Sequence, residues 1–241
     1  MLEKTQGIVL HTVKHTDSGI IAHIYTRDYG RLSFIIKGIH NKRSKTRSVY
    51  FQPLQILNIE MYYKDKRNLQ SIKEVNPAHN FKNIQVDLFR NSLTLFIGEV
   101  LSKSLRESPA DKNLYEYLVN SILFLDNNKG SISNFHIGFM VGLAKYLGIV
   151  PTSGFSNSTS VFDMQSGKYT GNIPLHGYYM EKDFAYLLNL FLNSTIEDCD
   201  RILLTGKIRK ELLNSLLIFY SLHLPGLKNI NSLEIFSEVF N

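Results

Sequence analysis

The stretch that decides the fold of the first third of this chain is residues 6–37, QGIVLHTVKHTDSGIIAHIYTRDYGRLSFIIK. Its apolar and β-branched residues predict three consecutive strands, separated by turn-rich residues: 6–14, 20–26 and 31–37. In the third segment Leu32, Phe34 and Ile36 alternate with other residues, as in a strand with one buried face. The glycine before this segment, Gly30, suits a tight hairpin turn.

Two more strands are predicted beyond a longer connection, at residues 54–63 and 69–75. The apolar phase of the first of them slips between Ile56 and Leu57, as a β-bulge would allow. Five short strands follow one another within 75 residues, with no helical pattern between them. This succession predicts a small five-stranded Greek-key barrel of the OB type.

After residue 77 the apolar period becomes helical. The pattern predicts six helices, over residues 86–101, 114–125, 135–147, 181–192, 208–223 and 232–240. Residues 152–178 are rich in Gly, Ser and Asn and predict an irregular, partly β-like insertion. We therefore predict an α+β chain of two domains, an OB-fold barrel at 1–80 and a helical domain at 81–241.

The charge of the chain is unevenly distributed. Of 241 residues with a net charge of +6, residues 1–80 hold 13 Lys and Arg against 6 Asp and Glu, a net charge of +7, and the remainder carries −1. Such asymmetry indicates a domain that meets a polyanion. The alternative is a basic surface that only keeps the protein soluble.

Candidate nucleic-acid contacts lie in the predicted barrel. Spaced cations neutralise phosphates, and exposed aromatic rings stack on bases. The cations expected to do so are Arg31, Lys37, Lys42, Arg43, Lys45, Arg47, Lys64, Lys66 and Arg67. Tyr29, in a predicted turn, is the expected stacking residue, whereas the alternation places Phe34 in the core.

No group of residues predicts catalysis. His11 and His15 would lie about 13 Å apart on a strand, too far to share a metal ion. The lone cysteine, Cys199, excludes an internal disulfide, and its neighbours Asp198 and Asp200 would raise the pKa of the thiol. We expect a non-enzymatic protein without a cofactor. Because no leader or membrane-spanning run is seen, we also expect it to be cytoplasmic.

The succession of short motifs resembles the RecO family of recombination mediators. The matching segments in the first third are GIVL at 7–10, DS at 17–18, IYTRDYGRL at 24–32, KG at 37–38, KRS at 42–44 and QPL at 52–54. Further matches are GEVL at 98–101, LGIVP at 147–151 and the residues His223, Leu227, Lys228, Ser232 and Leu233. The resemblance is strong in the first 75 residues and looser beyond them.

This resemblance implies a DNA-repair role at the bacterial nucleoid. Family members bind single- and double-stranded DNA and anneal complementary strands. With RecR, and often RecF, they help load RecA onto DNA coated by single-stranded DNA-binding protein. The alternative from another class is an adaptor whose basic barrel docks an acidic protein; a steep salt dependence of binding would favour DNA.

Two family features are altered in this chain. Many members carry four cysteines as a zinc site in the insertion, but residues 152–178 contain none, so we expect no zinc. The helical domain of the family also docks the C-terminal tail of single-stranded DNA-binding protein, for which Phe139, Leu143 and Lys145 are candidates. The alternative is that Phe139 and Leu143 are core residues. Asn134 and His136 stand where the family leads us to expect a basic residue.

Overall fold

The structure, a computed structural model, describes residues 1–17, 19–38, 48–106, 108–152 and 154–232. It contains two compact units, Met1–Asp126 and Asn127–Asn241, which are described separately here. Within the described residues, no helix has both the length and the apolar character needed to cross a membrane.

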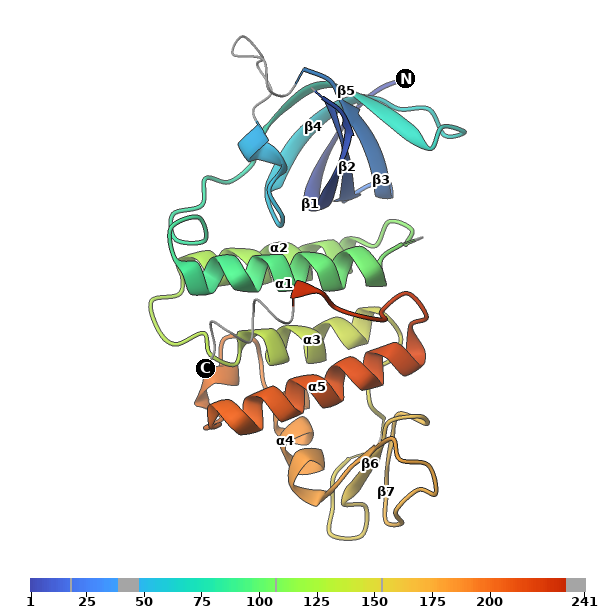
Figure 1. The fold of residues 1–241 in the computed structure, drawn as a ribbon, viewed down its shortest axis with the longest axis vertical. Coiled ribbons are helices and arrows are strands. Elements are labelled where there is room, and N and C mark those ends of the chain that lie inside the picture. The colour runs from blue at the N-terminus through green and yellow to red at the C-terminus, as the bar shows by residue number, and fades with distance from the viewer. Residues whose placement is uncertain (18, 39–47, 107, 153, 233–241) are drawn as a thin grey trace. The chain divides into compact units, whose positions relative to one another are not determined.

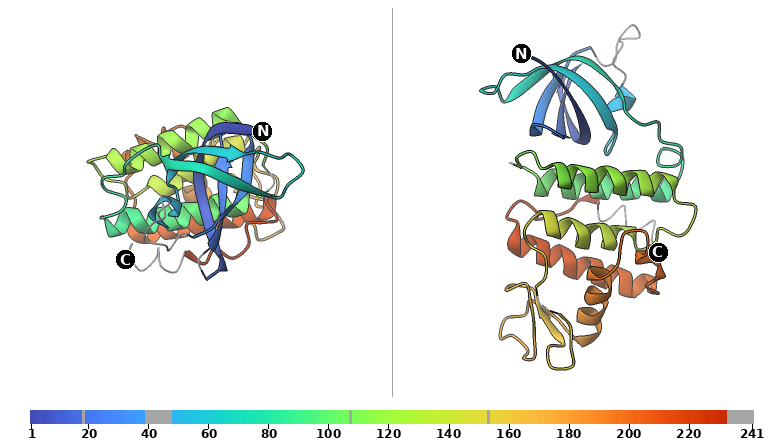
Figure 2. Two further views of the ribbon diagram at one scale, coloured as in Figure 1. Left: turned by 90° about the horizontal axis from the view of Figure 1, so that it is seen from above. Right: turned by 180° about the vertical axis from the view of Figure 1, so that it is seen from behind.

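The first unit begins with a closed five-stranded barrel (Figures 1 and 2). Its strands are β1 (Leu2–Thr16), β2 (Gly19–Thr26), β3 (Gly30–Ile36), β4 (Ile56–Tyr62) and β5 (Leu69–Pro77), and a short 3₁₀ helix, η1 (Ser48–Phe51), precedes β4. The strand order is β1-β2-β3-β5-β4, and only the β3–β5 pair is parallel. This arrangement confirms the predicted OB-type barrel.

The core of the barrel follows the alternation seen in the sequence. Phe34 and Ile36 are buried within it and Leu32 is partly buried against it. The predicted bulge lies elsewhere, because β4 pairs regularly with β1 through Leu57 and Ile56. The irregularity falls between Glu60 and Met61, where β4 pairs with β5.

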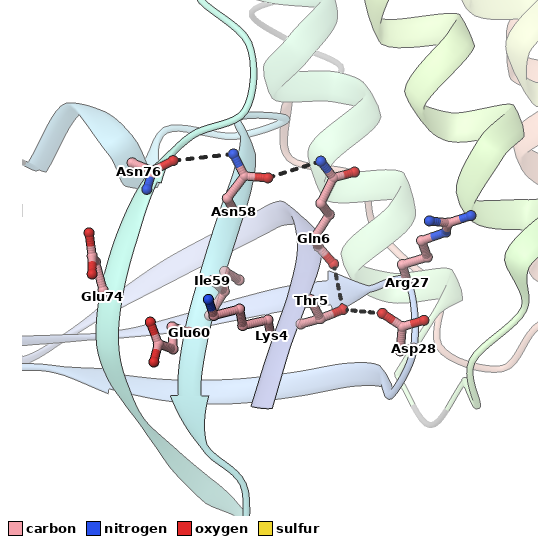
Figure 3. A pocket seen from close by; sticks show the side chains of 10 residues that line it. All are labelled: Lys4, Thr5, Gln6, Arg27, Asp28, Asn58, Ile59, Glu60, Glu74 and Asn76. Atoms are coloured by element: carbon pink, nitrogen blue, oxygen red, sulfur yellow. Dashed lines mark hydrogen bonds between the residues drawn. The ribbon is translucent and has the colours of Figure 1, made fainter. Parts of the chain in front are cut away.

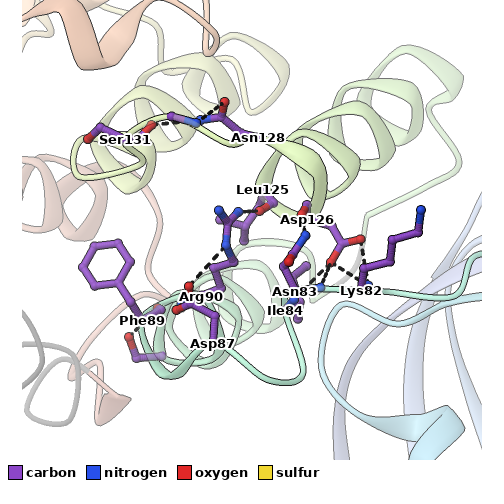
Figure 4. Close-up of polar contacts among 12 residues, drawn as sticks. Lys82, Asn83, Ile84, Asp87, Phe89, Arg90, Leu125, Asp126, Asn128 and Ser131 are labelled. Atoms are coloured by element: carbon purple, nitrogen blue, oxygen red, sulfur yellow. Dashed lines mark hydrogen bonds and ion pairs between the residues drawn. The ribbon is translucent and has the colours of Figure 1, made fainter.

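Two helices, α1 (Leu88–Ser104) and α2 (Lys112–Asn127), follow the barrel, and the first unit ends at the last turn of α2. The connection from barrel to helix is fixed by the buried carboxylate of Asp126 (Figure 4). This carboxylate accepts hydrogen bonds from the backbone N–H groups of Lys82, Asn83 and Ile84, at 2.9–3.1 Å. Burial alone would raise the pKa of Asp126, but these donors outweigh it and lower the pKa.

The compact units divide the chain after Asp126, and the predicted domain boundary at residue 80 lies within the first of them. The reason is that α1 and the segment before α2 pack on the barrel. The Tyr25 hydroxyl donates to the Pro109 carbonyl at 3.1 Å, and Gly98 of α1 lies close to the Leu10 carbonyl of β1. Apolar periodicity identifies each helix but not the surface that it packs against.

The second unit contains α3 (Phe135–Tyr146), β6 (Val161–Asp163), β7 (Lys168–Thr170), β8 (Tyr179–Met180), α4 (Lys182–Leu192), η2 (Cys199–Arg201) and α5 (Gly206–His223). The three short strands form a sheet in the order β7-β6-β8, within and just after the predicted insertion. The predicted helix at 232–240 falls almost wholly outside the described residues.

Candidate nucleic-acid interface

The turn between β4 and β5, Tyr63–Asn68, is called the basic hairpin below. It exposes three of the predicted cations, Lys64, Lys66 and Arg67. The buried side chain of Gln70 closes it: Oε1 accepts the Lys64 N–H at 3.0 Å, and Nε2 donates to the carbonyls of Lys64 and Arg67, both at 2.8 Å. The Arg67 N–H also donates to the Lys64 carbonyl, at 3.0 Å. The three cations thus stand on a turn whose backbone is fixed from within.

An aromatic pair supports the base of the basic hairpin. The rings of Tyr29 and Tyr63 lie 4.5 Å apart between centroids, tilted by 40°. Both side chains are partly buried against the barrel core, and the Tyr63 hydroxyl donates to Asp65 at 3.1 Å. Tyr29, the expected stacking residue, therefore has its ring in contact with Tyr63. The tyrosine that exposes most surface at this end of the barrel is Tyr62, 51% exposed.

Arg31 lies in a packing contact rather than on an open surface. Its Nη1 donates at 2.7 Å to the carbonyl of Ser102, near the C-terminal end of α1, and its backbone N–H donates to the Ser108 carbonyl at 3.2 Å. Burial lowers the pKa of Arg31, with a smaller effect from Arg106. A guanidinium suits the C-terminal end of a helix, where carbonyls and the dipole favour a cation. Arg31 therefore fastens α1 to the barrel, and the expected phosphate contact is not supported here.

The two histidines beside Arg31 belong to the same contact. The rings of His11 and His23 are stacked with centroids 4.4 Å apart, and each Nδ1 is hydrogen-bonded to a hydroxyl, of Ser102 and Ser33 respectively. Burial lowers the pKa of His11 to about 4, and the charges of His23 and Arg31 act in the same direction. His11 lies on a strand, as predicted, and its imidazole packs against α1.

The remaining predicted cations lie in and beside the connection after β3. Lys37 is exposed immediately beyond the end of β3. Lys42, Arg43, Lys45 and Arg47 lie outside the described residues. The structure therefore brings Lys64, Lys66 and Arg67 together with Tyr29, and it leaves the role of the loop a prediction.

The outer face of β1, β4 and β5 is polar and bounds a shallow pocket of about 530 Å³ (Figure 3). Three carboxamides form a row across these strands: Gln6 Nε2 donates to Asn58 Oδ1 at 2.9 Å, and Asn58 Nδ2 donates to Asn76 Oδ1 at 3.2 Å. The charged residues of the pocket are Lys4, Arg27, Asp28, Glu60 and Glu74. With three carboxylates against two cations, this face does not favour phosphates. This row was not predicted from the sequence, although polar residues alternate with apolar ones on β4.

The predicted docking residues of the second unit lie mostly in its core. Phe139 is 1% exposed and Leu143 is fully buried, whereas Lys145 is exposed. Buried side chains do not line an accessible groove, so the core alternative is correct for Phe139 and Leu143. An exposed groove of about 610 Å³ lies instead between α4 and the segment after η2. Its apolar lining includes Tyr186, Leu190 and Leu203, and Arg201 lies at its edge, paired with Asp198 at 3.1 Å.

The thiol of Cys199 has the properties of a structural residue. It is buried and donates to the Ile196 carbonyl at 3.0 Å. Burial and, to a smaller extent, the neighbouring carboxylates, Asp200 foremost, together raise its pKa to about 12, the direction expected from the sequence. Among the residues that the structure describes, no group of three or more His, Cys, Asp or Glu side chains is placed to hold a metal ion.

Comparison with known proteins agrees with this architecture. Two family models match the chain, Recombination protein O N terminal over residues 1–81 and Recombination protein O C terminal over residues 85–233. A relative named DNA repair protein RecO from Phocaeicola vulgatus is 33% identical over 241 residues, with 100% of both chains covered. Relatives of the same name from Bacteroides fragilis and Flavobacterium johnsoniae are 35% and 30% identical, covering 100% and 99% of both chains. The chain thus belongs to the RecO family of DNA repair proteins.

Proposed function

We propose that this protein is a recombination mediator that binds single- and double-stranded DNA and anneals complementary strands. With RecR, and with RecF where that partner is required, it helps load RecA onto DNA coated by single-stranded DNA-binding protein. Family membership supports the repair role, and the resemblance of the sequence supports these particular activities.

The observation that carries the proposal is the basic hairpin. Its three exposed cations, Lys64, Lys66 and Arg67, are presented on a turn that Gln70 already holds in shape. Phosphate binding then requires little ordering of the protein, and preorganisation of this kind favours affinity. The loop cations Lys42, Arg43, Lys45 and Arg47 extend the same proposal, on the ground of sequence alone.

Annealing follows from such a surface by simple electrostatics. Two complementary strands repel each other through their phosphates, and cations that neutralise both strands reduce this repulsion. Base pairing then proceeds without any covalent step. This mechanism agrees with the buried, unreactive Cys199, and it needs no nucleophile or metal from the protein.

The tail of single-stranded DNA-binding protein requires a separate docking surface. We propose that it docks in the groove between α4 and the segment after η2, because apolar side chains there adjoin the guanidinium of Arg201, whose present partner is Asp198 of the same groove. An apolar groove with one cation suits a peptide that ends in apolar residues and a carboxylate. Leu203, 92% exposed, is the residue to test. Leu203→Ser should abolish binding of a tail peptide and leave DNA binding unchanged.

The test of the proposal is annealing of two complementary oligonucleotides labelled as a fluorescence donor and acceptor. Wild-type protein should accelerate their pairing, both for bare strands and for strands coated with single-stranded DNA-binding protein. The variant Lys64→Gln/Lys66→Gln/Arg67→Gln should lose most of this acceleration. A matched variant, Lys168→Gln/Lys182→Gln/Lys210→Gln, removes three exposed cations from the second unit and should anneal as wild type does.

The adaptor alternative makes a different prediction. An acidic protein partner would bind the basic hairpin in the absence of DNA. The protein would then not accelerate the pairing of complementary oligonucleotides. Failure of the wild-type protein to accelerate annealing, together with loss of DNA binding at moderate salt, would favour the adaptor.

A further inference from the structure

Exposed apolar residues gather where β1, β4 and β5 meet at the base of the basic hairpin. Tyr62 is 51% exposed and stands directly opposite Leu2 of β1, which is 46% exposed. On its other side Tyr62 stands opposite Ser71 of β5, and Leu69, 38% exposed, lies two residues before Ser71 on the same face. Residues paired in this way are neighbours on one face of a sheet. Leu2, Tyr62 and Leu69 are called the Tyr62 patch below.

The Tyr62 patch adjoins the three cations of the basic hairpin, where Asp65 is the one acidic residue, and Glu60, two residues before Tyr62 on the same face, is paired with Lys73. Tyr62 immediately precedes the basic hairpin in the chain and Leu69 immediately follows it. The exposed residues Lys64, Lys66 and Arg67 lie between them. An apolar patch that docks a neutral protein would not need these cations in this position. A flat ring with apolar flanks beside phosphate-binding cations has the chemistry of a stacking platform for nucleic-acid bases.

Tyr62 also differs from the other tyrosines at this end of the barrel. The ring of Tyr29 is paired with that of Tyr63, and both are partly buried against the core. Because half of the surface of Tyr62 is exposed, its ring can receive a base without any rearrangement of the barrel. Gln70 fixes the backbone of the turn that follows Tyr62, so the cations project from a fixed turn beside the ring.

We propose that Tyr62 is a base-stacking site for single-stranded DNA, with Lys64, Lys66 and Arg67 holding the phosphates on either side of the stacked base. This proposal rests on the proposed function. It adds a distinction that phosphate contacts cannot make. Stacking requires a base whose face is free, so the Tyr62 patch recognises single strands, whereas the cations bind single strands and duplexes alike.

The absence of tryptophan from the chain provides a direct test. Tyr62→Trp introduces one fluorophore at the proposed site. Saturation with a single-stranded oligonucleotide should quench and shift its emission, because a stacked base contacts the indole ring. A duplex of the same length should bind with little change in emission. Tyr178→Trp, at a position 45% exposed in the second unit, is the matched control and should respond to neither.

Affinity measurements with the full-length protein complete the test. Tyr62→Leu keeps an apolar side chain but removes the aromatic face, and it should weaken single-strand binding about 5-fold to 100-fold. Tyr62→Phe should bind as wild type does. Duplex affinity, the slope of affinity against salt and the melting temperature should be unchanged in both variants.

Unchanged emission of Tyr62→Trp in a saturated single-strand complex would overturn the stacking site and leave DNA binding in place. Equal quenching by the duplex would also overturn it, since the contact would then be with the backbone. If instead a labelled oligonucleotide does not bind the wild-type protein at all, the proposed function itself fails.

Discussion

At the scale of single residues, the geometry of the basic hairpin depends on Gln70. Its carboxamide makes three hydrogen bonds to the backbone of a turn whose residues 64–68 are exposed and polar. A buried polar side chain with all of these partners satisfied stabilises one conformation of the turn. The cations themselves contribute charge, and Gln70 determines where that charge is held.

Gln70→Met keeps the length of the side chain and removes all three hydrogen bonds. We expect a loss of about 1–3 kcal/mol in the free energy of unfolding, measured by urea denaturation. The Lys64 amide, which donates to Gln70 Oε1, should lose its protection from hydrogen exchange. Ser71→Ala, at the exposed neighbouring position, serves as the control. Full protection of the Lys64 amide in Gln70→Met would show that the turn keeps its conformation without the hydrogen bonds of Gln70.

A second prediction at this scale concerns pH. Burial lowers the pKa of His11 from 6.5 to about 4. Between these values the unfolded chain binds a proton at His11 and the folded chain does not, so the free energy of unfolding should fall as the pH falls from about 6.5 towards 4. At pH 5 carboxylates such as Asp126, whose pKa is lowered, remain ionised.

The measurement compares urea midpoints at pH 7 and pH 5. His11→Gln should lose less stability over this interval than wild type, because it removes the proton that only the unfolded chain binds. His15→Gln changes an exposed histidine and should behave as wild type does. An equal loss in all three proteins would contradict the assignment of the pH effect to His11.

The residues of the candidate site were only partly predictable from the sequence. The cations were found because like charges clustered near turns are visible in one dimension. The packing role of Arg31 could not be predicted, because its hydrogen bond to the Ser102 carbonyl joins residues 71 apart in the chain. Gln70 had a weak signal, a polar residue in the inward phase of a strand beside Ile72. Nothing in one sequence shows that its partners are the carbonyls of a neighbouring turn.

At the scale of elements, the β2–β3 hairpin depends on Gly30. Its φ of +67° lies in the left-handed region. A Cβ at this position would lie 2.5–2.7 Å from backbone atoms of Ser108, Pro109 and Ala110. The absence of a side chain thus lets the segment before α2 lie directly against the turn.

Gly30→Ala should therefore destabilise the protein for two separable reasons. The left-handed backbone costs about 1–2 kcal/mol for a residue with a Cβ, and the backbone clash adds to it. Gly148→Ala has a similar φ of +70° and no atom within 4 Å of the added Cβ, so it reports the conformational cost alone. In thermal denaturation, the melting temperature of Gly30→Ala should be well below that of Gly148→Ala. Equal melting temperatures would contradict the close packing at Gly30.

The three-stranded insertion of the second unit is held by aromatic packing. Phe162 is fully buried, with its ring 5.2 Å from that of Tyr169 and 5.5 Å from that of Phe219. Phe155 adds contacts with Tyr169 and Tyr186. These aromatic contacts pack an insertion whose sequence, residues 152–178, contains no cysteine. In the sequence, Phe155, Phe162 and Tyr169 stand out among small polar residues.

Elemental analysis of the purified protein should accordingly find no stoichiometric zinc, and a chelator should leave the melting temperature unchanged. Phe162→Ala should lower the melting temperature strongly, because removal of a buried phenylalanine costs about 3–5 kcal/mol. One equivalent of zinc, lost together with stability on chelation, would contradict this account of the insertion.

Secondary structure was predicted well where the chain repeats a simple period. The strand at 31–37 and the helix at 135–147 correspond to β3 and α3 within one residue at each end. β1 is longer than predicted at its start because Leu2–Gln6 pairs with β4, more than 50 residues away. The sequence of this strand end does not predict a strand, because residues 2–5 combine one apolar residue with charged and polar ones.

At the scale of the whole molecule, the positive charge is distributed unequally between the two compact units. The first unit carries 18 Lys and Arg against 12 Asp and Glu, and the second unit carries 9 of each. All of the excess positive charge is therefore on the unit that contains the barrel. We propose that this unit binds DNA through the exposed cations of the basic hairpin.

The most direct test is the affinity of the full-length protein for a labelled single-stranded oligonucleotide, measured by fluorescence anisotropy between about 50 and 200 mM salt. The logarithm of the association constant should fall linearly with the logarithm of the salt concentration. In Lys64→Gln/Lys66→Gln/Arg67→Gln the slope should become shallower by about 2, since each lost phosphate contact removes about 0.7. A slope as steep as that of wild type would contradict DNA binding by these three cations and place the DNA-binding surface outside the basic hairpin.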